Sequence, residues 1–378
     1  MKQTSFLEQP RRGNTHEVQL TPHKRSAVWG EHSKRSAVWG EHNKRSAVWD
    51  DHSKRNAVCI ILAIAVCVTL MTTSCGTKKE APQKEGALSG EISISGAFAL
   101  YPLAVKWVEE FQKANPSVHI DISAGGAGKG MTDVLANVVD LGMVSREVYP
   151  PEIEKGAVPF AVTKDAVVIT VNTENPFAAE MKRQGITMEE AYKVWISGEI
   201  KTWGQLLGTA DDTPIHVYTR SDACGAAETF AMWMGKKQED LQGTAVFGDP
   251  GLAQAVQRDK LAVGFNNIGY AYDEESRKPN TGLFVFPIDR DGDGSISAGE
   301  YFYDTKDDFV EAVAADKYPS PPARDLYLVT NGTPTNPAVV AFLKYVLTDG
   351  QQECAPAGYI SLSNDKLQKG VEQLRTKN

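Results

Sequence analysis

The 378-residue sequence has few cysteines, no apolar run of bilayer length and no basic excess in its main body. Five cysteines, widely scattered, are too few for a disulfide scaffold. The apolar run at residues 57–71 is shorter than the stretch of about 20 residues that spans a bilayer comfortably. Residues 1–56 carry 11 Lys or Arg against 6 Asp or Glu, so a formal charge of −8 leaves −13 on the remainder. Because nucleic acids are held by clustered Lys and Arg, we expect no nucleic-acid partner.

The composition, 42% hydrophobic and 23% charged, is that of a folded chain rather than a disordered one. The length suffices for two ordinary domains with additional segments.

Residues 23–59 contain four similar units with a period of about ten, each beginning with His and carrying Lys-Arg. Such a short unit has too little apolar surface to build a core. We therefore predict that residues 1–56 are an extension that is unfolded or is removed with an export signal. Metal or membrane-surface binding by the repeated His, Lys, Arg and Trp is the alternative.

Residues 57–75 resemble a lipoprotein signal segment. Small residues lead to Cys75, where the apolar run has ended, and the chain then turns polar. A cleaved signal without lipid, or a signal anchor, is the alternative. We expect an exported protein that is lipid-anchored through Cys75 on the periplasmic or cell-surface side, with residues 76–89 as a tether.

The body from residue 90 onward alternates strand-like and helix-like segments. Residues 92–94, 118–122 and 141–144 read as strands, Pro102 suits a first helical turn, and helical spacing recurs from Met131 to Val138. This βαβαβ opening predicts a parallel sheet with helices on both faces.

The later chain continues the α/β pattern. Thr187 and Glu190 form a capping-box pattern, and Asn336 and Pro337 open a helix that we expect to close at Gly350. The predicted strands lie at 166–171, which would cross into a second lobe, near 261–265 and at 283–288.

The segment 219–230 predicts an anion clamp. An apolar strand, residues 215–218, runs into Arg220 and Asp222, and Gly225 then lies in a turn that opens a helical pattern. A helix N-terminus offers free N–H groups and a positive dipole end, and an arginine adds a fork of donors. The alternative is that Arg220 and Asp222 merely pair with each other.

Three further turns at predicted strand ends suit an anion. They are residues 97–102, the glycine-rich residues 124–130, and Ser145 with Arg146. The glycine-rich turn lacks the G-K-[ST] ending of a Walker sequence. Ligands of open α/β sheets bind beyond the carboxyl ends of strands, so the four turns point to one cleft.

In their order, segments 96–102, 139–146, 218–225, 264–270 and 318–328 resemble those of the phosphate-binding lipoproteins of phosphate ABC importers. The resemblance covers residues 90–365. It implies a two-lobed α/β fold of the type II periplasmic-binding class, with mixed sheets and a ligand cleft between the lobes. It also implies capture of phosphate for ABC permease subunits by a non-enzymatic protein, which we expect to be monomeric. The expected lobes are 90–168 with 311–378, and 169–310.

The site that the resemblance implies departs from the family pattern. Positions that carry hydroxyls or an Asp in relatives align here with Leu100, Ala127, Ser145, Cys224 and Ala226. Loss of the carboxylate that accepts a ligand proton affects the discrimination of phosphate from sulfate, arsenate or molybdate, so a protein for another tetrahedral oxyanion is an alternative. The predicted phosphate-binding residues are Leu100, Tyr101, Ala127, Gly128, Ser145, Arg146, Arg220, Asp222, Cys224, Gly225 and Ala226.

Residues 289–300 predict a calcium loop that the anion hypothesis does not require. Acidic residues stand at loop positions one, three and five, a glycine at six and a glutamate at twelve, the spacing that supplies calcium with oxygen ligands. A solvated acidic turn is the alternative. The predicted ligands of a structural calcium ion are Asp289, Asp291, Asp293, Ser295 and Glu300.

Two other classes of function stay open. Cys224 at a helix N-terminus is a candidate nucleophile, because that position lowers a thiol pKa, but no Cys–His pattern accompanies it. The second of these classes is a calcium-stabilised surface interaction protein on the same scaffold. We expect a binding protein and no enzyme.

Overall fold

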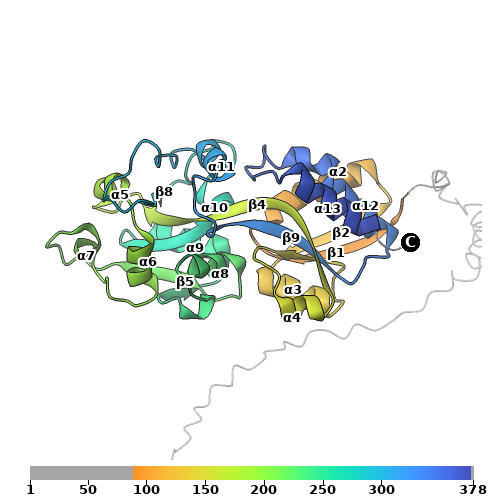
Figure 1. Cartoon of the computed structure of the whole chain (residues 1–378), viewed down its shortest axis with the longest axis horizontal. Helices are drawn as coiled ribbons and strands as arrows, with labels where there is room; N and C mark the ends of the chain where they lie inside the picture. Colours follow the sequence, from red (N-terminus) through yellow and green to blue (C-terminus); the bar gives the residue numbers. More distant parts are fainter. Residues whose placement is uncertain (1–87, 376–378) are drawn as a thin grey trace, which may run out of the picture. The chain divides into compact units, whose positions relative to one another are not determined.

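The computed structural model describes residues 88–375, which form two α/β lobes (Figure 1). The strands are β1 (Gly90–Gly96), β2 (Val118–Ala124), β3 (Leu141–Val144), β4 (Ala157–Asn172), β5 (His216–Arg220), β6 (Thr244–Val246), β7 (Ala262–Asn267), β8 (Leu283–Phe286) and β9 (Ala323–Asn331).

The helices alternate with these strands in sequence. They are α2 (Tyr101–Ala114), α3 (Ala127–Leu135), α4 (Pro150–Glu154), α5 (Ala178–Gln184), α6 (Met188–Trp195), α7 (Trp203–Leu207), α8 (Gly225–Trp233), α9 (Gly248–Arg258), α10 (Ile268–Ala271), α11 (Lys306–Ala314), α12 (Pro337–Leu347) and α13 (Asn364–Arg375). Residues 88–375 also contain two 3₁₀ helices, η1 (Gln238–Asp240) and η2 (Asp349–Glu353).

The strand order is β2-β1-β3-β9-β4-β7-β5-β6, with β8 also paired to β4. The predicted βαβαβ opening is confirmed, since β1 is parallel to both β2 and β3. In the second lobe β5 is parallel to β6 and β7, whereas β4 and β9 run antiparallel to their neighbours. The sheets are therefore mixed, as predicted.

Two long strands connect the lobes. β4 is a 16-residue strand, whose first part pairs with β9 and whose last part, residues 167–172, pairs with β7 and β8. Figure 1 shows β4 and β9 side by side between the two groups of elements. The predicted strand 166–171 is the end of this strand.

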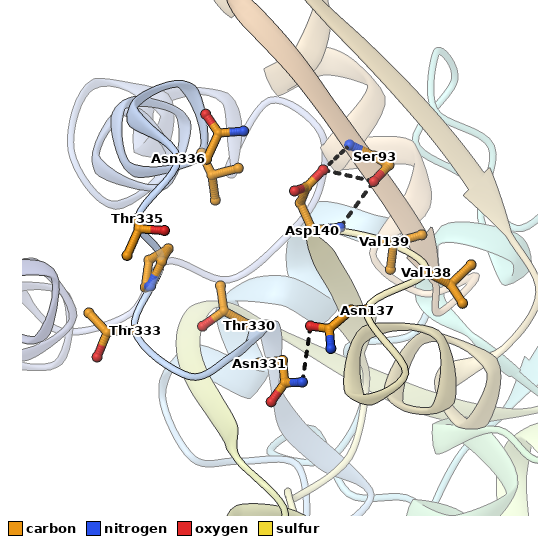
Figure 2. A pocket seen from close by; sticks show the side chains of 12 residues that line it. Ser93, Asn137, Val138, Val139, Asp140, Thr330, Asn331, Thr333, Thr335 and Asn336 are labelled. Atoms are coloured by element: carbon orange, nitrogen blue, oxygen red, sulfur yellow. Dashed lines mark hydrogen bonds between the residues drawn. The ribbon is translucent and has the colours of Figure 1, made fainter.

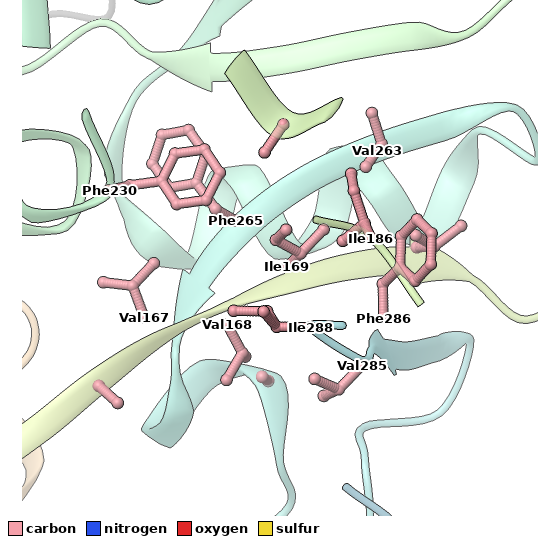
Figure 3. Close-up of a cluster of buried hydrophobic side chains, with 14 of the residues drawn as sticks. Val167, Val168, Ile169, Ile186, Phe230, Val263, Phe265, Val285, Phe286 and Ile288 are labelled. Carbon is pink, nitrogen blue, oxygen red and sulfur yellow. The ribbon is translucent and has the colours of Figure 1, made fainter. Parts of the chain in front are cut away.

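Each lobe has its own apolar core. The first includes Trp107, Phe160 and Phe342. In the second, shown in Figure 3, Phe230 and Phe265 stack with ring centroids 4.6 Å apart. Fully burying one such large side chain contributes about 1.5–3 kcal/mol, so each lobe has its own source of stability. The division of the chain between lobes stays a prediction.

Several local predictions are confirmed. The Thr187 Oγ1 atom accepts a hydrogen bond from Glu190 N at 3.2 Å, and Glu190 Oε2 accepts one from Thr187 N at 2.9 Å, which completes the capping box. Asn336 Oδ1 accepts a bond from Ala338 N at 2.9 Å, and Pro102 lies in the first turn of α2.

Two helix ends were predicted wrongly. α12 ends at Leu347 because the backbone leaves helical values at Thr348, with φ −125 and ψ −100, so Gly350 lies in η2. α3 ends at Leu135, and Asn137 then adopts a left-handed φ of 54, which leaves Val138 67% exposed. Both ends are set by packing and turn geometry rather than by apolar spacing.

Among residues 88–375, no helix is both long and apolar enough to cross a bilayer. The repeats, the apolar run 57–71 and the predicted lipidation site Cys75 lie outside the described residues, as does nearly all of the predicted tether.

Candidate functional site

Arg220 ends β5 with a fully buried side chain, 0% exposed. Its Nε donates to Asp222 Oδ1 at 2.9 Å and its Nη2 to Asp222 Oδ2 at 2.7 Å. Its Nη1 donates to Asp249 Oδ2 at 2.6 Å. The pairing of Arg220 with Asp222 is therefore present. These acceptors take three of the five guanidinium N–H groups, and the other two have no acceptor among residues 88–375.

Asp249 was missed by sequence reasoning. It lies in the first turn of α9 and is 2% exposed in its side chain. Its Oδ1 accepts bonds from Asn267 Nδ2 at 2.7 Å and Asn267 N at 3.3 Å. Burial by itself would lower the pKa of Arg220, but Asp249 and Asp222 together raise it, so the guanidinium stays charged. No helix was predicted from the sequence at α9, and Asp249 lies in none of the segments singled out there.

Helix α8 begins directly after the Arg220 turn, as predicted. Its N-cap is Cys224, whose Sγ accepts a bond from Ala227 N at 3.4 Å. The N–H groups of Gly225 and Ala226, in the first turn, have no partner within the helix. Burial raises the pKa of Cys224 to about 12, against the opposite effect of Arg220. The expectation of a lowered thiol pKa was wrong, because desolvation exceeds the effect of the helix end.

Gly225 places α8 against the end of β3. A Cβ atom at Gly225 would lie 2.1 Å from Ser145 O and 2.3 Å from Ser145 Oγ. Only a glycine allows this approach. Two predicted site residues from different lobes are thus in direct contact.

The glycine-rich turn makes a second contact with the Arg220 turn. Gly128 N donates to Ala223 O at 3.0 Å, and a Cβ atom at Gly128 would lie 2.7 Å from Ala223 Cβ. Gly126, the N-cap of α3, has a φ of 92 and approaches Asp222. Ala127, the first residue of α3, is buried behind these contacts.

The turn at residues 97–102 meets the site through the ring and the carbonyl of Phe98 rather than through backbone N–H groups. Leu100 N and Tyr101 N both donate to Ala97 O, at 3.2 Å each, so these two groups are used within the turn. The Phe98 ring centroid lies 5.8 Å from Arg220 Cζ, and Tyr270 donates its hydroxyl to Phe98 O at 3.2 Å. Phe98 is a further residue that sequence reasoning missed.

Arg146 is engaged by its own neighbours in the chain. Its Nη1 donates to Glu152 Oε2 at 2.9 Å and its Nη2 to Glu152 Oε1 at 2.7 Å. The guanidinium also lies over the Tyr149 ring, 4.2 Å from its centroid. The neighbouring Ser145 is buried. Of this predicted pair, Ser145 lies directly against α8, whereas Arg146 reaches α8 through Tyr149, whose hydroxyl donates to Glu228 Oε1 at 2.6 Å.

The crossing strands add a group of buried polar side chains that the sequence did not reveal. Arg324 on β9 donates from Nε to Ser145 O at 3.1 Å and from Nη2 to Asn267 Oδ1. Asp165 on β4 lies with Oδ2 3.6 Å from Arg324 Nη2. The resemblance had marked the Arg324 segment without assigning it a role.

The predicted calcium loop has three acidic side chains together. Carboxylate oxygens of Asp289, Asp291 and Asp293 all lie within 4.8 Å of one another. Ser295 Oγ donates to Asp293 Oδ1 at 2.8 Å, and Glu300 Oε1 accepts a bond from Arg290 N at 2.9 Å. The loop thus gathers most of the predicted ligands, while Glu300 is engaged by the loop backbone.

A pocket of about 260 Å³ lies at the amino end of β3 and the carboxyl end of β9 (Figure 2). Ser93 Oγ donates to Asp140 Oδ2 at 2.8 Å, and Asn331 Nδ2 donates to Asn137 Oδ1 at 3.1 Å. The carboxylate of Asp140 stands at the amino end of β3, so this pocket does not suit an anion.

Comparison with known proteins relates the chain to binding proteins. Residues 81–350 match the family model described as the PBP superfamily domain. "Phosphate-binding protein PstS" of Pseudomonas aeruginosa is 26% identical over 317 residues, 77% of this chain and 89% of that protein. The protein of the same name from Staphylococcus saprophyticus is 24% identical and covers 79% of this chain and 88% of its own length.

Solved structures show the same fold. A protein from Clostridium perfringens, solved with bound phosphate, has a TM-score of 0.59 at 22% identity and covers 72% of this chain and 100% of its own. An ABC-type phosphate transport receptor from Vibrio cholerae has a TM-score of 0.53 at 19% identity, with the same coverage. With the family match over 81–350, these findings confirm the predicted resemblance: the chain belongs to the PBP superfamily of two-lobed binding proteins.

Proposed function

We propose that this protein is an extracytoplasmic solute-binding protein that captures phosphate between its lobes and delivers it to an ABC importer. The observation that carries the proposal is Arg220, a fully buried guanidinium with two N–H groups left, at the N-terminus of α8. A buried cation beside free helix N–H groups favours an anion strongly. The names of the relatives favour phosphate as that anion.

The hydrogen-bond donors of the proposed anion site are mainly backbone N–H groups and a guanidinium rather than side-chain hydroxyls. Leu100, Ala127 and Ala226 bring only backbone groups, so an anion would be held by Arg220, Ser145 and the N–H groups of Gly225 and Ala226. These groups all donate hydrogen bonds to an anion. The nearby carboxylates of Asp222 and Asp249 already accept bonds from Arg220. A tetrahedral anion without a proton, such as sulfate or molybdate, is therefore the second candidate ligand.

Binding rather than catalysis is the role that we propose. A cysteine nucleophile must be deprotonated, whereas burial raises the pKa of Cys224 to about 12. Both Cys224 and Cys354 are buried and free, and they lie in different cores. The thiol of Cys224 thus serves as an N-cap.

The attachment to a membrane is also a proposal. The sequence around Cys75 favours a lipid anchor, with a short tether before β1 and with permease subunits at the same membrane. A monomer satisfies this arrangement, because one chain supplies both lobes of the cleft.

A structural calcium ion in the loop 289–300 forms a separate part of the proposal. The clustering of Asp289, Asp291 and Asp293 supports it. A hydrogen bond from the Asp293 backbone lowers the pKa of Asp291, but burial and the neighbouring carboxylates together raise it, so these charges repel one another. A bound cation would relieve that repulsion.

Isothermal titration tests the proposed function. The full-length protein, purified in detergent, stripped of bound anion and loaded with calcium, is titrated with phosphate and then with sulfate, arsenate and molybdate. Phosphate binding tighter than that of the other anions supports import of phosphate. A response to another anion alone would change the ligand, and no response to any of the four would leave the calcium-stabilised interaction protein as the better hypothesis.

A further inference from the structure

Arg324 and Asp165 face each other across the two crossing strands. They are directly paired in the register of β9 and β4, and their exposed fractions are 6% and 1%. Neither the predicted clamp nor the glycine-rich turn uses them. A buried arginine and a buried aspartate at the point where the lobes join call for a physical explanation.

The hydrogen bonds of this pair are incomplete. Arg324 uses Nε on Ser145 O and Nη2 on Asn267 Oδ1, but its buried Nη1 has no hydrogen-bond partner among the described residues. The two buried carboxylate oxygens of Asp165 also lack one there, with Arg324 Nη2 at 3.6 Å. Since buried donors normally find an acceptor, the free Nη1 is suited to a ligand oxygen.

Arg324 is connected to the proposed anion site on two sides. Its acceptor Ser145 is the residue against which Gly225 packs. Its other acceptor, Asn267, donates to Asp249, which in turn accepts from Arg220. One chain of bonds therefore links two buried guanidinium groups around the contact of β3 with α8.

A cavity gives access to this region. It has a volume of about 320 Å³, and Arg324 lines it together with Lys164 on β4, Lys366 on α13, and Thr229 and Met232 on α8. Both lobes contribute to its wall. Glu147 and Asp325 also line the cavity, and Lys366 pairs with Asp325, so the attraction of an anion rests on Arg324 and Lys164.

We infer that Arg324 is a second anion-binding side chain of the cleft, and that Asp165 is the positioning residue that orients it. This inference rests on the proposed function. The guanidinium takes over the role of donors that Leu100, Ala127 and Ala226 do not supply. Two guanidinium groups favour a doubly charged tetrahedral oxyanion over a singly charged one, because each adds a charge-assisted bond.

The variant Arg324→Lys tests the inference, since it keeps the charge and removes the fork of donors. We expect the Kd for phosphate to rise on the order of 10- to 100-fold, as for loss of a hydrogen bond to a charged group. Arg277→Lys is the matched control, because Arg277 pairs with Asp307 away from the cleft, and its Kd should equal that of the unchanged protein. Anion-free melting temperatures are measured in parallel.

The outcomes separate the two proposals. A lowered melting temperature with an unchanged Kd would assign Arg324 a structural role only and overturn the inference. Absence of binding to phosphate, sulfate, arsenate and molybdate in the unchanged protein would overturn the proposed function as well. If Arg324→Lys does not fold, the variant Asp165→Asn is titrated with phosphate in its place. We expect its Kd for phosphate to rise about three- to tenfold, and an unchanged Kd contradicts the positioning role.

Discussion

At the residue scale, the candidate anion site contains charges that are buried in compensating sets. Arg220 is balanced by Asp222 and Asp249, and Asn267 orients Asp249. Removing one member of a buried ion pair is costly because the other charge stays buried without compensation. Substitutions here therefore act on stability and on binding together, and the two effects must be measured separately.

Arg220→Ala should lower the free energy of unfolding by about 3–5 kcal/mol, because it leaves Asp249 as an uncompensated buried carboxylate. Arg220→Lys keeps the charge, so it should lose less stability but still weaken phosphate binding by a factor of about 10 or more. Urea unfolding and calorimetric titration measure the two quantities. The exposed Arg183→Lys serves as the control, and equal binding by both lysine variants would contradict the role of Arg220.

Asp165 predicts a pH dependence of stability. Burial raises its pKa from 3.8 to about 6, although Arg324 opposes this. Folding thus favours the protonated form, and this contribution is present below pH 3.8 and is lost as the pH rises through about 6. Without anion, the stability of Asp165→Asn relative to the unchanged protein should be greater at pH 7.5 than at pH 4, by up to about 3 kcal/mol.

Urea unfolding at pH 7.5 and at pH 4 checks the direction in which the stability difference changes. The exposed Asp212→Asn should shift stability equally at both, since its carboxylate lies outside the buried network. A stability difference for Asp165→Asn that grows as the pH falls would mean that Arg324 controls the Asp165 carboxylate more than burial does.

At the element scale, the predicted calcium loop follows a strand rather than a helix. β8 ends at Phe286, and Ile296 in the loop donates its N–H to Arg183 O at 2.8 Å, beside the end of α5. After the loop, Phe302 and Tyr303 stack at 4.6 Å and pack on Phe309. The loop is thus fixed at both ends to the second core, so an ion bound there would stabilise this lobe.

Calcium should raise the melting temperature of the protein. At a free calcium concentration of 100 times Kd, the free energy of unfolding should gain about 2.7 kcal/mol. Asp293→Asn should remove most of this gain, since it deletes one charge of the acidic cluster. Scanning calorimetry with calcium and with a chelator measures the effect. Asp304→Asn, which lies just outside the loop, should keep the full gain, and the proposal is wrong if the unchanged protein does not respond to calcium.

At the scale of the whole molecule, close backbone contacts are one of the ways in which the lobes meet. Gly225 against Ser145 and Gly128 against Ala223 are contacts that even one methyl group would disturb. The lobes are also linked by β4 and β9 and by the contacts of Phe98 with Arg220 and Tyr270. Closure on a ligand therefore depends on glycines at these two contacts.

Gly225→Ala should prevent full closure, because its Cβ atom would lie 2.1 Å from Ser145 O. Overpacking of this kind costs about 1–3 kcal/mol, so phosphate affinity should fall about 5- to 100-fold. Small-angle scattering should show a decrease in radius of gyration on phosphate binding for the unchanged protein and a smaller one for the variant. Gly269→Ala, where the nearest atom is 3.8 Å away, should behave like the unchanged protein.

Much of the architecture could be predicted because its signals are local. Apolar spacing located β1, β2 and β3, and the side chains of Thr187 and Asn336 marked helix starts. The ends at Val138 and Gly350 were predicted wrongly, since a left-handed residue and the packing of Trp107 on Gly350 are not visible in periodicity. In the site, Arg220 and Gly225 were found through their turn, whereas Asp249 has no local motif and Asn267 lies in the segment 264–270, to which the resemblance assigned no role.

The sequence by itself determined the α/β alternation, the position of the Arg220 turn and the spacing of the acidic loop, because each depends on residues close together in the chain. Only the tertiary structure decided that Asp249 joins Asp222 on Arg220, that Arg146 turns to Glu152, and that Arg324 reaches Ser145. These contacts join residues on different elements, and several join positions far apart in sequence. Their geometry is fixed by the crossing of β4 and β9 and by the close approach of α8 to β3.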